Sequence, residues 1–513
     1  MTYTSLYFAV FITALFIVYF ILPKKFRWVS LLAGSYVFYY LAAGVGALGL
    51  IIVTSVVIFL IALILGYIHK KYKKEKRKSM IYRRLVMTAG LLYAFGVLAY
   101  LKYSNFIIEI VNELSGGDVS YLDLLLPLGI SFYTFQVSGY LIDVYRGKYE
   151  PDRNIFKFAL FTCFFPQIVQ GPISRYDQLA NQLYEGHKFD YTRIKFGVML
   201  IIWGYFKKMV IADRAAAIVT TLVNNPGDYS GFEVAFGGIA YMIQIYGDFS
   251  GGIDISIGIA QIFGITLVQN FRQPYFADSL NEYWRRWHIT LGAWTRDYIF
   301  FSISLSKFAS RFAKAARNKV GPYLAKTLPS CFAMGVVFMV IGIWHGAAWQ
   351  YVAFAVYNAV IVMAEILILP LITGFFIEKG IFKKGSNVWK GITIVITLFI
   401  VFIGKFFTMP HNLTDGIQMM HNMFTTWNPS VLWDGTLCHM GLDLDNMVLL
   451  IITVVILFAA DLMKEKNIQI RETFDRRNII FKGIVYIVSI LSIVIFGIYG
   501  TEINVTTFIY QQF

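Results

Sequence analysis

The chain has 513 residues, of which 58% are hydrophobic, 17% aromatic and only 15% charged. Because soluble domains carry about 25% charged residues, this composition excludes an ordinary soluble enzyme and indicates a membrane protein. The net charge of +15 is expected from basic cytoplasmic loops, and these loops are too short to hold a nucleic-acid-binding module. We therefore expect membrane lipids, and no nucleic acid, among the partners.

The first apolar run, Ser5–Leu22, begins almost at Met1 and has neither a basic leader nor a small-residue cleavage site. It is predicted to be a retained membrane helix, since a span needs about 20 apolar residues. The third apolar run is Ala47–Ile68, and the basic segment Lys70–Arg84 follows it. Because basic loops stay in the cytoplasm, the N-terminus is predicted to lie outside.

Apolar runs continue along the chain and predict about 11 to 14 transmembrane segments. Between residues 122 and 300 they are interrupted by Gly, Pro and charged residues, which predicts short, discontinuous or re-entrant helices. Lys207, Lys208 and Arg214 continue a series of basic residues that predicts a middle region facing the cytoplasm.

Further apolar runs at Ile341–Leu369 and Phe481–Tyr499 are each long enough to span a bilayer. No soluble domain fits between the runs, so the fold class predicted is an all-α polytopic membrane protein. The chain shows no internal repeat, which argues against a transporter built from inverted repeats. We expect one membrane domain over 1–513, with N-terminal helices at 1–121, a core carrying the polar motifs at 122–370 and C-terminal helices at 371–513.

Several polar residues lie at membrane depth beside Gly and Pro. Asp248, Ser250 and Asp254 belong to the stretch YGDFSGGIDISIG, and Gln170 belongs to FFPQIVQGPISRY. Unwound backbone beside polar groups favours the lining of a cavity. Helix packing, with the aspartates paired to nearby arginines, is the structural alternative.

The stretch Asn281–Phe300, NEYWRRWHITLGAWTRDYIF, is far too polar for an ordinary lipid-facing helix. Charges at membrane depth tend to face a cavity or one another, and tryptophans prefer the headgroup level, so this segment is predicted to line a pocket or to lie at the interface. An amphipathic interfacial helix without chemistry is the alternative. The candidate site residues here are Arg285, Arg286, Trp287, His288, Arg296 and Asp297.

In the stretch Met339–Ala348, MVIGIWHGAA, His345 is the one ionisable group of an apolar helix rich in small residues. Gly342 and Gly346 are expected to let another backbone approach closely. A histidine in such a place is either a hydrogen-bonded structural residue or a catalyst. Its ordinary pKa of roughly 6.5 suits a group that takes and returns a proton near neutral pH.

Metal and redox chemistry are not expected. Cys163, Cys331 and Cys438 form no CxxC or Cys/His cluster, and no pair of histidines has the spacing of a metal site. The sequence therefore predicts no bound metal and no permanently bound cofactor.

Taken in order, these stretches resemble the membrane-bound O-acyltransferase (MBOAT) family, in its bacterial alginate O-acetylase and DltB-like branch. The resemblance covers most of the chain. It is carried by PLGISFYTFQVSGYLIDVYRG at Pro127–Gly147, FFPQIVQGPISRYDQL at Phe164–Leu179, YGDFSGGIDISIGIAQIFG at Tyr246–Gly264, FRQPYFADSLNEYWRRWHITLGAWTRDYIF at Phe271–Phe300, WHGAAW at Trp344–Trp349 and the ending FIYQQF at Phe508–Phe513.

The resemblance implies a ring of helices around a thinned centre, with a tunnel from a cytoplasmic funnel to His345 as the catalytic residue and His288 as a second functional group. It implies O-acylation, most simply acetylation, of an extracellular polysaccharide by a multi-pass protein of the bacterial cytoplasmic membrane. The expected donor is acetyl-CoA or an acyl carrier protein thioester, and the expected partner is an extracytoplasmic SGNH-hydrolase-like protein. The tunnel lining is expected from Trp344, Asp248, Ser250, Asp254, Gln170, Arg285, Arg286, Trp287, Arg296 and Asp297.

Two departures from the branch stand out. After Tyr298 the chain lacks the usual Pro-Leu-Gly-Gly-Asn-Arg segment, and in VFIGKFFTMP it has Lys405 and Thr408 where relatives commonly have Trp and Arg. Two other functions remain open: D-alanyl transfer to teichoic acid from a carrier protein, and a transporter or flippase that uses the histidines as proton relays.

Overall fold

The computed structural model describes residues 1–379, 386–499 and 508. In this part of the chain the regular structure is helical throughout, and seven helices are long and apolar enough to cross a membrane. The predicted all-α polytopic class is thus confirmed. The total of 11 to 14 spans stays a prediction, because the remaining described helices are either too short or not apolar enough to meet the same criteria. All but the first residue of FIYQQF lies outside the described residues.

The chain divides into two compact units. Described residues 1–201 and 252–268 form the first, in which Gly44, at φ +83°, kinks the long helix α2. Buried α5 packs on α2, where the Thr162 and Ser55 hydroxyls lie 2.6 Å apart. Its helices are α1 (Leu6–Ile21), η1 (Lys24–Phe26), α2 (Arg27–Lys71), α3 (Lys76–Ser115), α4 (Ile130–Arg146), α5 (Ile155–Cys163), α6 (Phe165–Ile168), α7 (Tyr176–Tyr184) and most of α8 (Tyr191–Tyr205).

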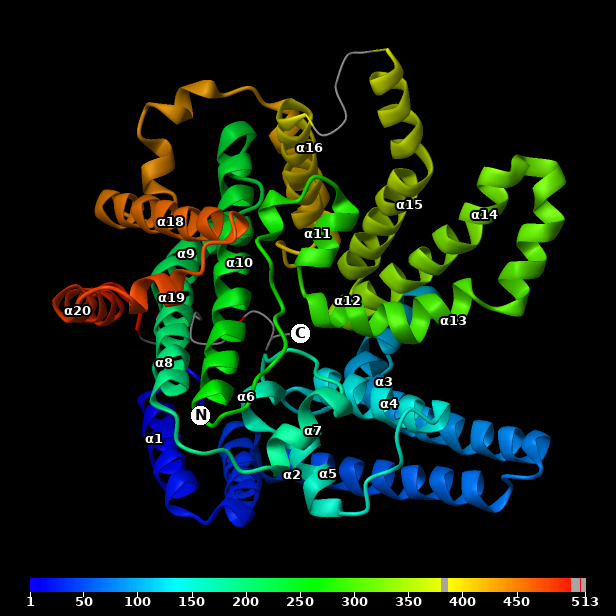
Figure 1. Ribbon diagram of the computed structural model, residues 1–513. Helices are drawn as coiled ribbons and strands as arrows, with labels where there is room; N and C mark the ends of the chain where they lie inside the picture. The colour runs from blue at the N-terminus through cyan, green and yellow to red at the C-terminus, as the bar shows by residue number, and fades with distance from the viewer. Residues whose placement is uncertain (380–385, 500–507, 509–513) are drawn as a thin grey trace. The chain divides into compact units, whose positions relative to one another are not determined.

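The second unit holds residues 202–251 and the described residues from 269 onward. The predicted interruption of the middle region is seen here as a succession of short helices between α10 and α14 (Figure 1). Its helices are η2 (Phe206–Ala212), α9 (Asp213–Asn224), the first part of α10 (Gly231–Ile262), η3 (Pro274–Phe276), α11 (Leu280–Arg286), α12 (Ile289–Thr295), η4 (Arg296–Phe300), α13 (Phe301–Ser304), α14 (Lys307–His345), α15 (Trp349–Glu378), α16 (Asn387–Lys405), α17 (Leu413–Thr425), η5 (Pro429–Leu432), η6 (Thr436–His439), α18 (Leu444–Glu465), α19 (Ile470–Asp475) and α20 (Ile479–Phe496).

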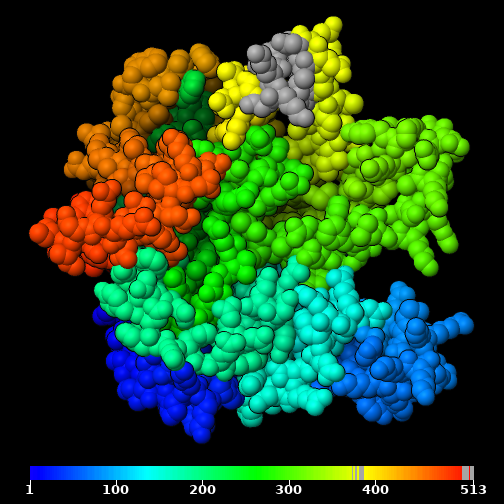
Figure 2. All heavy atoms as spheres, in the orientation of Figure 1, coloured from blue at the N-terminus to red at the C-terminus, as the bar shows by residue number. Residues whose placement is uncertain are grey.

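Apolar side chains face outward on the long helices, as expected for contact with lipid. On α20, drawn in orange-red in Figure 2, Ile479 and Ile480 are 78% and 73% exposed, and Ile495 is 64% exposed. Water would make so much exposed apolar surface unfavourable, whereas lipid tails would not. The helix is therefore built to face a bilayer.

The apolar run Ile341–Leu369 is not one helix. Helix α14 ends at His345, the next residue Gly346 is extended, and α15 begins at Trp349 (Figure 1). His345 does belong to a helix, as expected, but it is the last residue of that helix. An apolar pattern reports burial or lipid contact and does not mark where a chain turns back, which is why the run looked continuous.

The small residues near this turn have the predicted effect. Helices α14 and α15 pack against each other, and a Cβ on Gly342 would overlap the Cβ of Ala355 and the carbonyl oxygen of Tyr351. A Cβ on Gly346 would overlap the ring of Tyr351. The close approach of the two helices thus depends on glycine at both positions.

Replacing Gly342 with alanine should lower the free energy of unfolding by about 1–3 kcal/mol, because the methyl group meets backbone that cannot rotate away. Gly335→Ala is the matched control on the same helix, since only the Met363 sulfur, at 3.8 Å, lies near the place that the new Cβ would take. That control should be neutral or stabilising, by up to about 1 kcal/mol of helix propensity. Thermal unfolding in detergent measures both, and equal melting temperatures for the two variants would contradict the packing argument.

Candidate active site

His288 lies at the junction of two short helices in the second unit. It follows α11 by two residues and is the N-cap of α12, with backbone angles of φ 49° and ψ 51°. This left-handed conformation is uncommon for residues other than glycine, although asparagine, aspartate and histidine adopt it more often than the others. The side chain is 2% exposed. A strained backbone that points a buried histidine inward is a feature that the surrounding structure must hold in place.

Asn270 holds that junction. Its backbone oxygen accepts from the Ile289 N–H at 3.0 Å, and its Oδ1 accepts from the Thr290 N–H at 3.0 Å and the Thr290 hydroxyl at 2.9 Å. The same Oδ1 lies 3.3 Å from His288 Nδ1. Because this oxygen is an acceptor, the contact fits a neutral imidazole protonated at Nδ1, which leaves Nε2 as the basic nitrogen.

One indole contacts both candidate histidines. The Trp344 ring lies 5.7 Å from the His288 ring and 4.9 Å from the His345 ring, measured between centroids. His345 is 9% exposed and also meets the edge of Phe354, at 5.8 Å. The polar motif around His288 and the motif around His345 therefore converge on Trp344, although α12, η4, α13 and most of α14 separate them in sequence.

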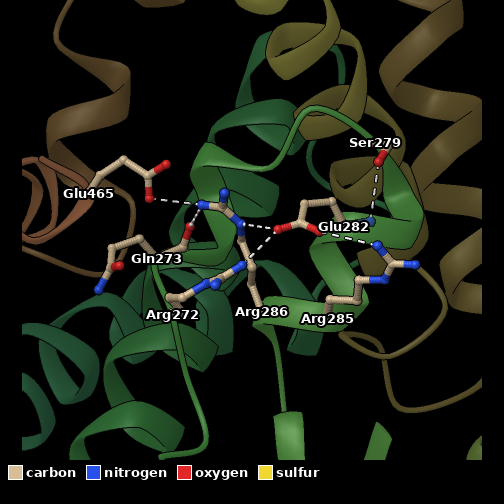
Figure 3. Close-up of polar contacts among 7 residues, drawn as sticks. All are labelled: Arg272, Gln273, Ser279, Glu282, Arg285, Arg286 and Glu465. Atoms are coloured by element: carbon tan, nitrogen blue, oxygen red, sulfur yellow. Dashed lines mark hydrogen bonds and ion pairs between the residues drawn. The ribbon is translucent and has the colours of Figure 1, made fainter. Parts of the chain in front are cut away.

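Helix α11, which leads to His288, is fixed at both ends. At its start the Glu365 carboxylate of α15 accepts from the backbone N–H groups of Leu280, at 2.6 Å, and Asn281, at 2.9 Å. At its end Arg286 donates to Glu282 and to Glu465 of α18, each at 2.8 Å (Figure 3). Negative charge at a helix N-terminus is stabilising, as are charge-assisted hydrogen bonds of this length.

Arg285 and Arg286 thus have different surroundings. Arg286, which donates to Glu282 and Glu465, has a side chain that is 12% exposed. The Arg285 side chain is 69% exposed and lies 3.9 Å from Glu282. Although burial raises it, the pKa of Glu282 is lowered overall by the hydrogen bonds and charges of Arg286 and Arg272. A polar pocket of about 310 Å³ opens here, lined by Asp278, Ser279, Asn281, Glu282, Arg285, Arg286 and Lys390.

Trp287 is buried among aromatic rings. Phe271 lies 5.0 Å from it edge-on, and Tyr283 stacks on it at 5.7 Å. The ammonium group of Lys405 lies 4.8 Å from the centre of the same ring. Phe249 of α10 contacts both Trp287, at 6.2 Å, and His288, at 4.9 Å.

Asp248 and Ser250 of α10 belong to a buried ionic network with η2. Asp248 accepts from Lys208 at 2.5 Å, Lys208 also pairs with Asp213 at 2.8 Å, and Lys207 donates to the Ser250 hydroxyl at 2.8 Å. Asp248 is thus paired with a lysine, Lys208.

That this middle region faces or approaches the cytoplasm stays a prediction, but its basic side chains are themselves buried in the fold. Lys207, Lys208 and Arg214 are each 4% exposed or less. Their charges are balanced within the fold, since Lys208 meets two carboxylates and Arg214 bonds to Asn446 and to two backbone carbonyls. A buried cation is tolerated only when it is paired or hydrogen-bonded in this way.

The remaining candidates lie elsewhere. Arg296 is exposed and pairs with its neighbour Asp297 at 3.1 Å on η4. Gln170 and Asp254 belong to the first unit, where the buried Gln170 amide packs against Gly252 and Asp254 is partly exposed. Their predicted role in a tunnel lining stays a prediction.

Sequence reasoning missed Asn270, Lys208, Glu365 and Glu465. Asn270 sits one residue before the polar motif at Phe271 and has no charge to draw attention. Glu365 and Glu465 lie in apolar helices, where the few acidic residues were the available signal. Which residue each of them contacts could not be read from spacing.

The arrangement places a basic nitrogen, His288 Nε2, in surroundings of low polarity. Burial lowers the pKa of His288 to about 3, so its imidazole is neutral at physiological pH. His288 lies between α11 and α12, outside the seven candidate spans. A neutral imidazole can accept a hydrogen bond or position a reactant, and a second imidazole on the same indole is available for proton transfer.

Comparison with known proteins identifies the class. A model of the membrane-bound O-acyltransferase family matches residues 151–315. The chain is 32% identical to the probable alginate O-acetylase of Azotobacter vinelandii over 66% of its own length and 63% of that protein, slightly under two thirds. It is 30% identical to the probable alginate O-acetylase of Pseudomonas aeruginosa over 84% and 76%, and 29% identical to the teichoic acid D-alanyltransferase of Bacillus subtilis over 56% and 71%.

The chain belongs to the membrane-bound O-acyltransferase family. The family resemblance drawn from the sequence motifs is thereby confirmed. The matched segment at 151–315 contains His288 and ends before His345.

Asn270→Ala should reduce the free energy of unfolding by about 1–3 kcal/mol, because it leaves the Thr290 N–H and hydroxyl buried without their acceptor. Asn281→Ala is the matched control, since Asn281 is partly exposed and contributes its backbone N–H to Glu365; it should change stability by less than about 0.5 kcal/mol. Chemical or thermal unfolding of the two variants makes the comparison. A fully stable Asn270→Ala would show that the left-handed junction needs no such support.

Proposed function

We propose that this protein moves an acetyl group from a cytoplasmic thioester donor across the membrane for O-acetylation of a cell-envelope polysaccharide, with His345 as general base. The observation that carries the proposal is the convergence of His288 and His345 on Trp344, at the point where α14 ends. Similarity to proteins named as alginate O-acetylases favours acetyl as the group and a polysaccharide as the acceptor.

The chemistry requires one proton carrier. An acceptor hydroxyl gives its proton to the His345 imidazole while its oxygen attacks the thioester carbonyl carbon. The tetrahedral intermediate then collapses, the carbon–sulfur bond breaks, and the imidazolium returns the proton to the leaving thiolate. A positioned base of this kind contributes about 10²–10⁴ in rate. His288, neutral and held by Asn270, positions a reactant through Nε2.

The setting follows from the same proposal. The donor is acetyl-CoA or an acyl carrier protein thioester on the cytoplasmic side, reached through a tunnel, and no cofactor is held permanently. The protein lies in the bacterial cytoplasmic membrane with its N-terminus outside. An extracytoplasmic SGNH-hydrolase-like partner passes the acetyl group to the final polysaccharide.

D-alanyl transfer to teichoic acid is the second candidate. It is favoured by the similarity to the teichoic acid D-alanyltransferase of Bacillus subtilis, which extends over 71% of that protein. The two candidates share the histidine chemistry and differ in the donor. Supplying acetyl-CoA and a D-alanyl carrier protein to the same preparation separates them.

His345→Ala should lower thioester-dependent transfer at least about 100-fold while the fold is retained, because the general base is lost. His439→Ala, an exposed histidine of the same unit, should retain full activity. The assay is release of free thiol and labelled product from purified protein in vesicles. Undiminished transfer by His345→Ala would refute the assignment, and movement of an acylated substrate without thioester cleavage would indicate a transporter.

His288 should not set the pH dependence of the reaction. Because burial lowers its pKa to about 3, its charge does not change between pH 5 and 8, and its neutral form is lost only in strong acid. His288→Asn should therefore reduce the rate without moving the pH at which the acid limb of the kcat profile falls. A profile measured from pH 5 to 9 tests this, and a shifted acid limb in the variant would assign the proton transfer to His288.

A further inference from the structure

Lys405 is a buried cation that the acyl-transfer chemistry does not use. It is the last residue of α16 and is 5% exposed. Its ammonium group lies 4.8 Å from the centre of the Trp287 ring. Among the described residues, no carboxylate lies within 4.0 Å of it and no side chain or backbone oxygen accepts a hydrogen bond from it.

The other buried lysines of this unit are satisfied in a different way. Lys208 lies between the carboxylates of Asp213 and Asp248, and Lys207 donates to the Ser250 hydroxyl. An ammonium group withdrawn from water costs more free energy than a single aromatic face returns. A positive charge at Lys405 would therefore be left uncompensated by the described residues.

This charge stands beside the candidate active site. Trp287 precedes His288 directly, and Phe249 contacts both of their rings. Helix α11, whose C-cap is Trp287, also packs on α16. A group held by the Lys405 ammonium would thus be separated from the histidine junction by little more than one indole.

We propose that Lys405 binds an anionic oxygen group, a phosphate or a carboxylate, of one of the reactants. The identity of that reactant rests on the proposed function: thioester donors carry phosphate on their pantetheine arm, and acidic polysaccharides carry carboxylate. The existence of the anion site rests on the burial and the missing partner of Lys405 alone. Positive charge in a site of low polarity attracts an anion more strongly than the same charge in water.

Lys390 provides a matched control on the same helix. It is exposed, lines the polar pocket near Arg285, and stands about 22 Å from Lys405 at 1.5 Å of rise per residue. Lys390→Met removes the same charge from α16 without touching the buried position. If the anion were attracted only by general positive charge, both Lys405→Met and Lys390→Met would weaken its binding. If it binds at Lys405, only Lys405→Met would abolish the binding.

The first test measures thermal unfolding of the purified full chain in detergent, with inorganic phosphate and acetate as probes. Lys405→Met should melt at the same temperature as the wild type or higher, because it removes an uncompensated buried charge. At about 10 mM, one of the two anions should raise the melting temperature of the wild type, Lys405→Arg and Lys390→Met, but not of Lys405→Met. A response to phosphate would identify the bound group as a phosphate, and a response to acetate would identify it as a carboxylate.

A Lys405→Met protein that melts far below the wild type, with no anion response in any variant, would show that Lys405 is only a packing residue and would overturn the proposal. So would an equal anion response in the wild type and in Lys405→Met. These readouts need no turnover. If the wild type binds the anion but cleaves no thioester, the proposed function fails and the anion site stands.

The second test uses turnover. For a phosphate at Lys405, Lys405→Met should raise the KM for acetyl-CoA at least tenfold and leave the KM for acetyl-pantetheine, which lacks phosphate, unchanged. For a carboxylate, the KM for an acidic saccharide acceptor should rise, and that for a neutral saccharide should not. Lys405→Arg should restore the wild-type KM in either case. An unchanged KM for every charged reactant would contradict the proposal.

Discussion

The close approach of α14 and α15 is the contact on which the candidate site depends. Gly342 and Gly346 bring the backbones together, so α14 must end at His345 and the chain must turn before Trp349. This end point presents Trp344 and His345 side by side to the His288 junction.

Much of the charge around the histidines serves to hold them. Arg286 joins α11 to α18 through Glu465, and Glu365 of α15 binds the first N–H groups of the same helix. Buried pairs of this kind return little net stability, but removal of either partner leaves a costly charge. They therefore specify one position for α11, and with it the direction in which His288 points. Lys405, which has no such partner among the described residues, is the exception.

The class of fold and the two histidines could be predicted, because apolar spans, membrane-depth charge and family motifs are properties of local sequence. The polar stretch around His288 was rightly separated from lipid-facing helices. What could not be predicted depends on distant residues: Arg286 meets Glu465 across 179 positions, and Lys208 is neutralised by Asp248 across 40. Neither the turn after His345 nor the support from Asn270 leaves a periodic signal.

The buried Arg214 has a consequence for how the chain is made. Its guanidinium donates to the carbonyl of Phe496, 282 residues later, and the neighbouring Met209 carbonyl accepts from Ile498. At ribosomal speeds of 5–20 residues per second, roughly 15 to 60 s pass between synthesis of the two ends of this contact. During that interval the Arg214 guanidinium on α9 lacks one of its hydrogen-bond acceptors, until the end of α20 has been synthesised.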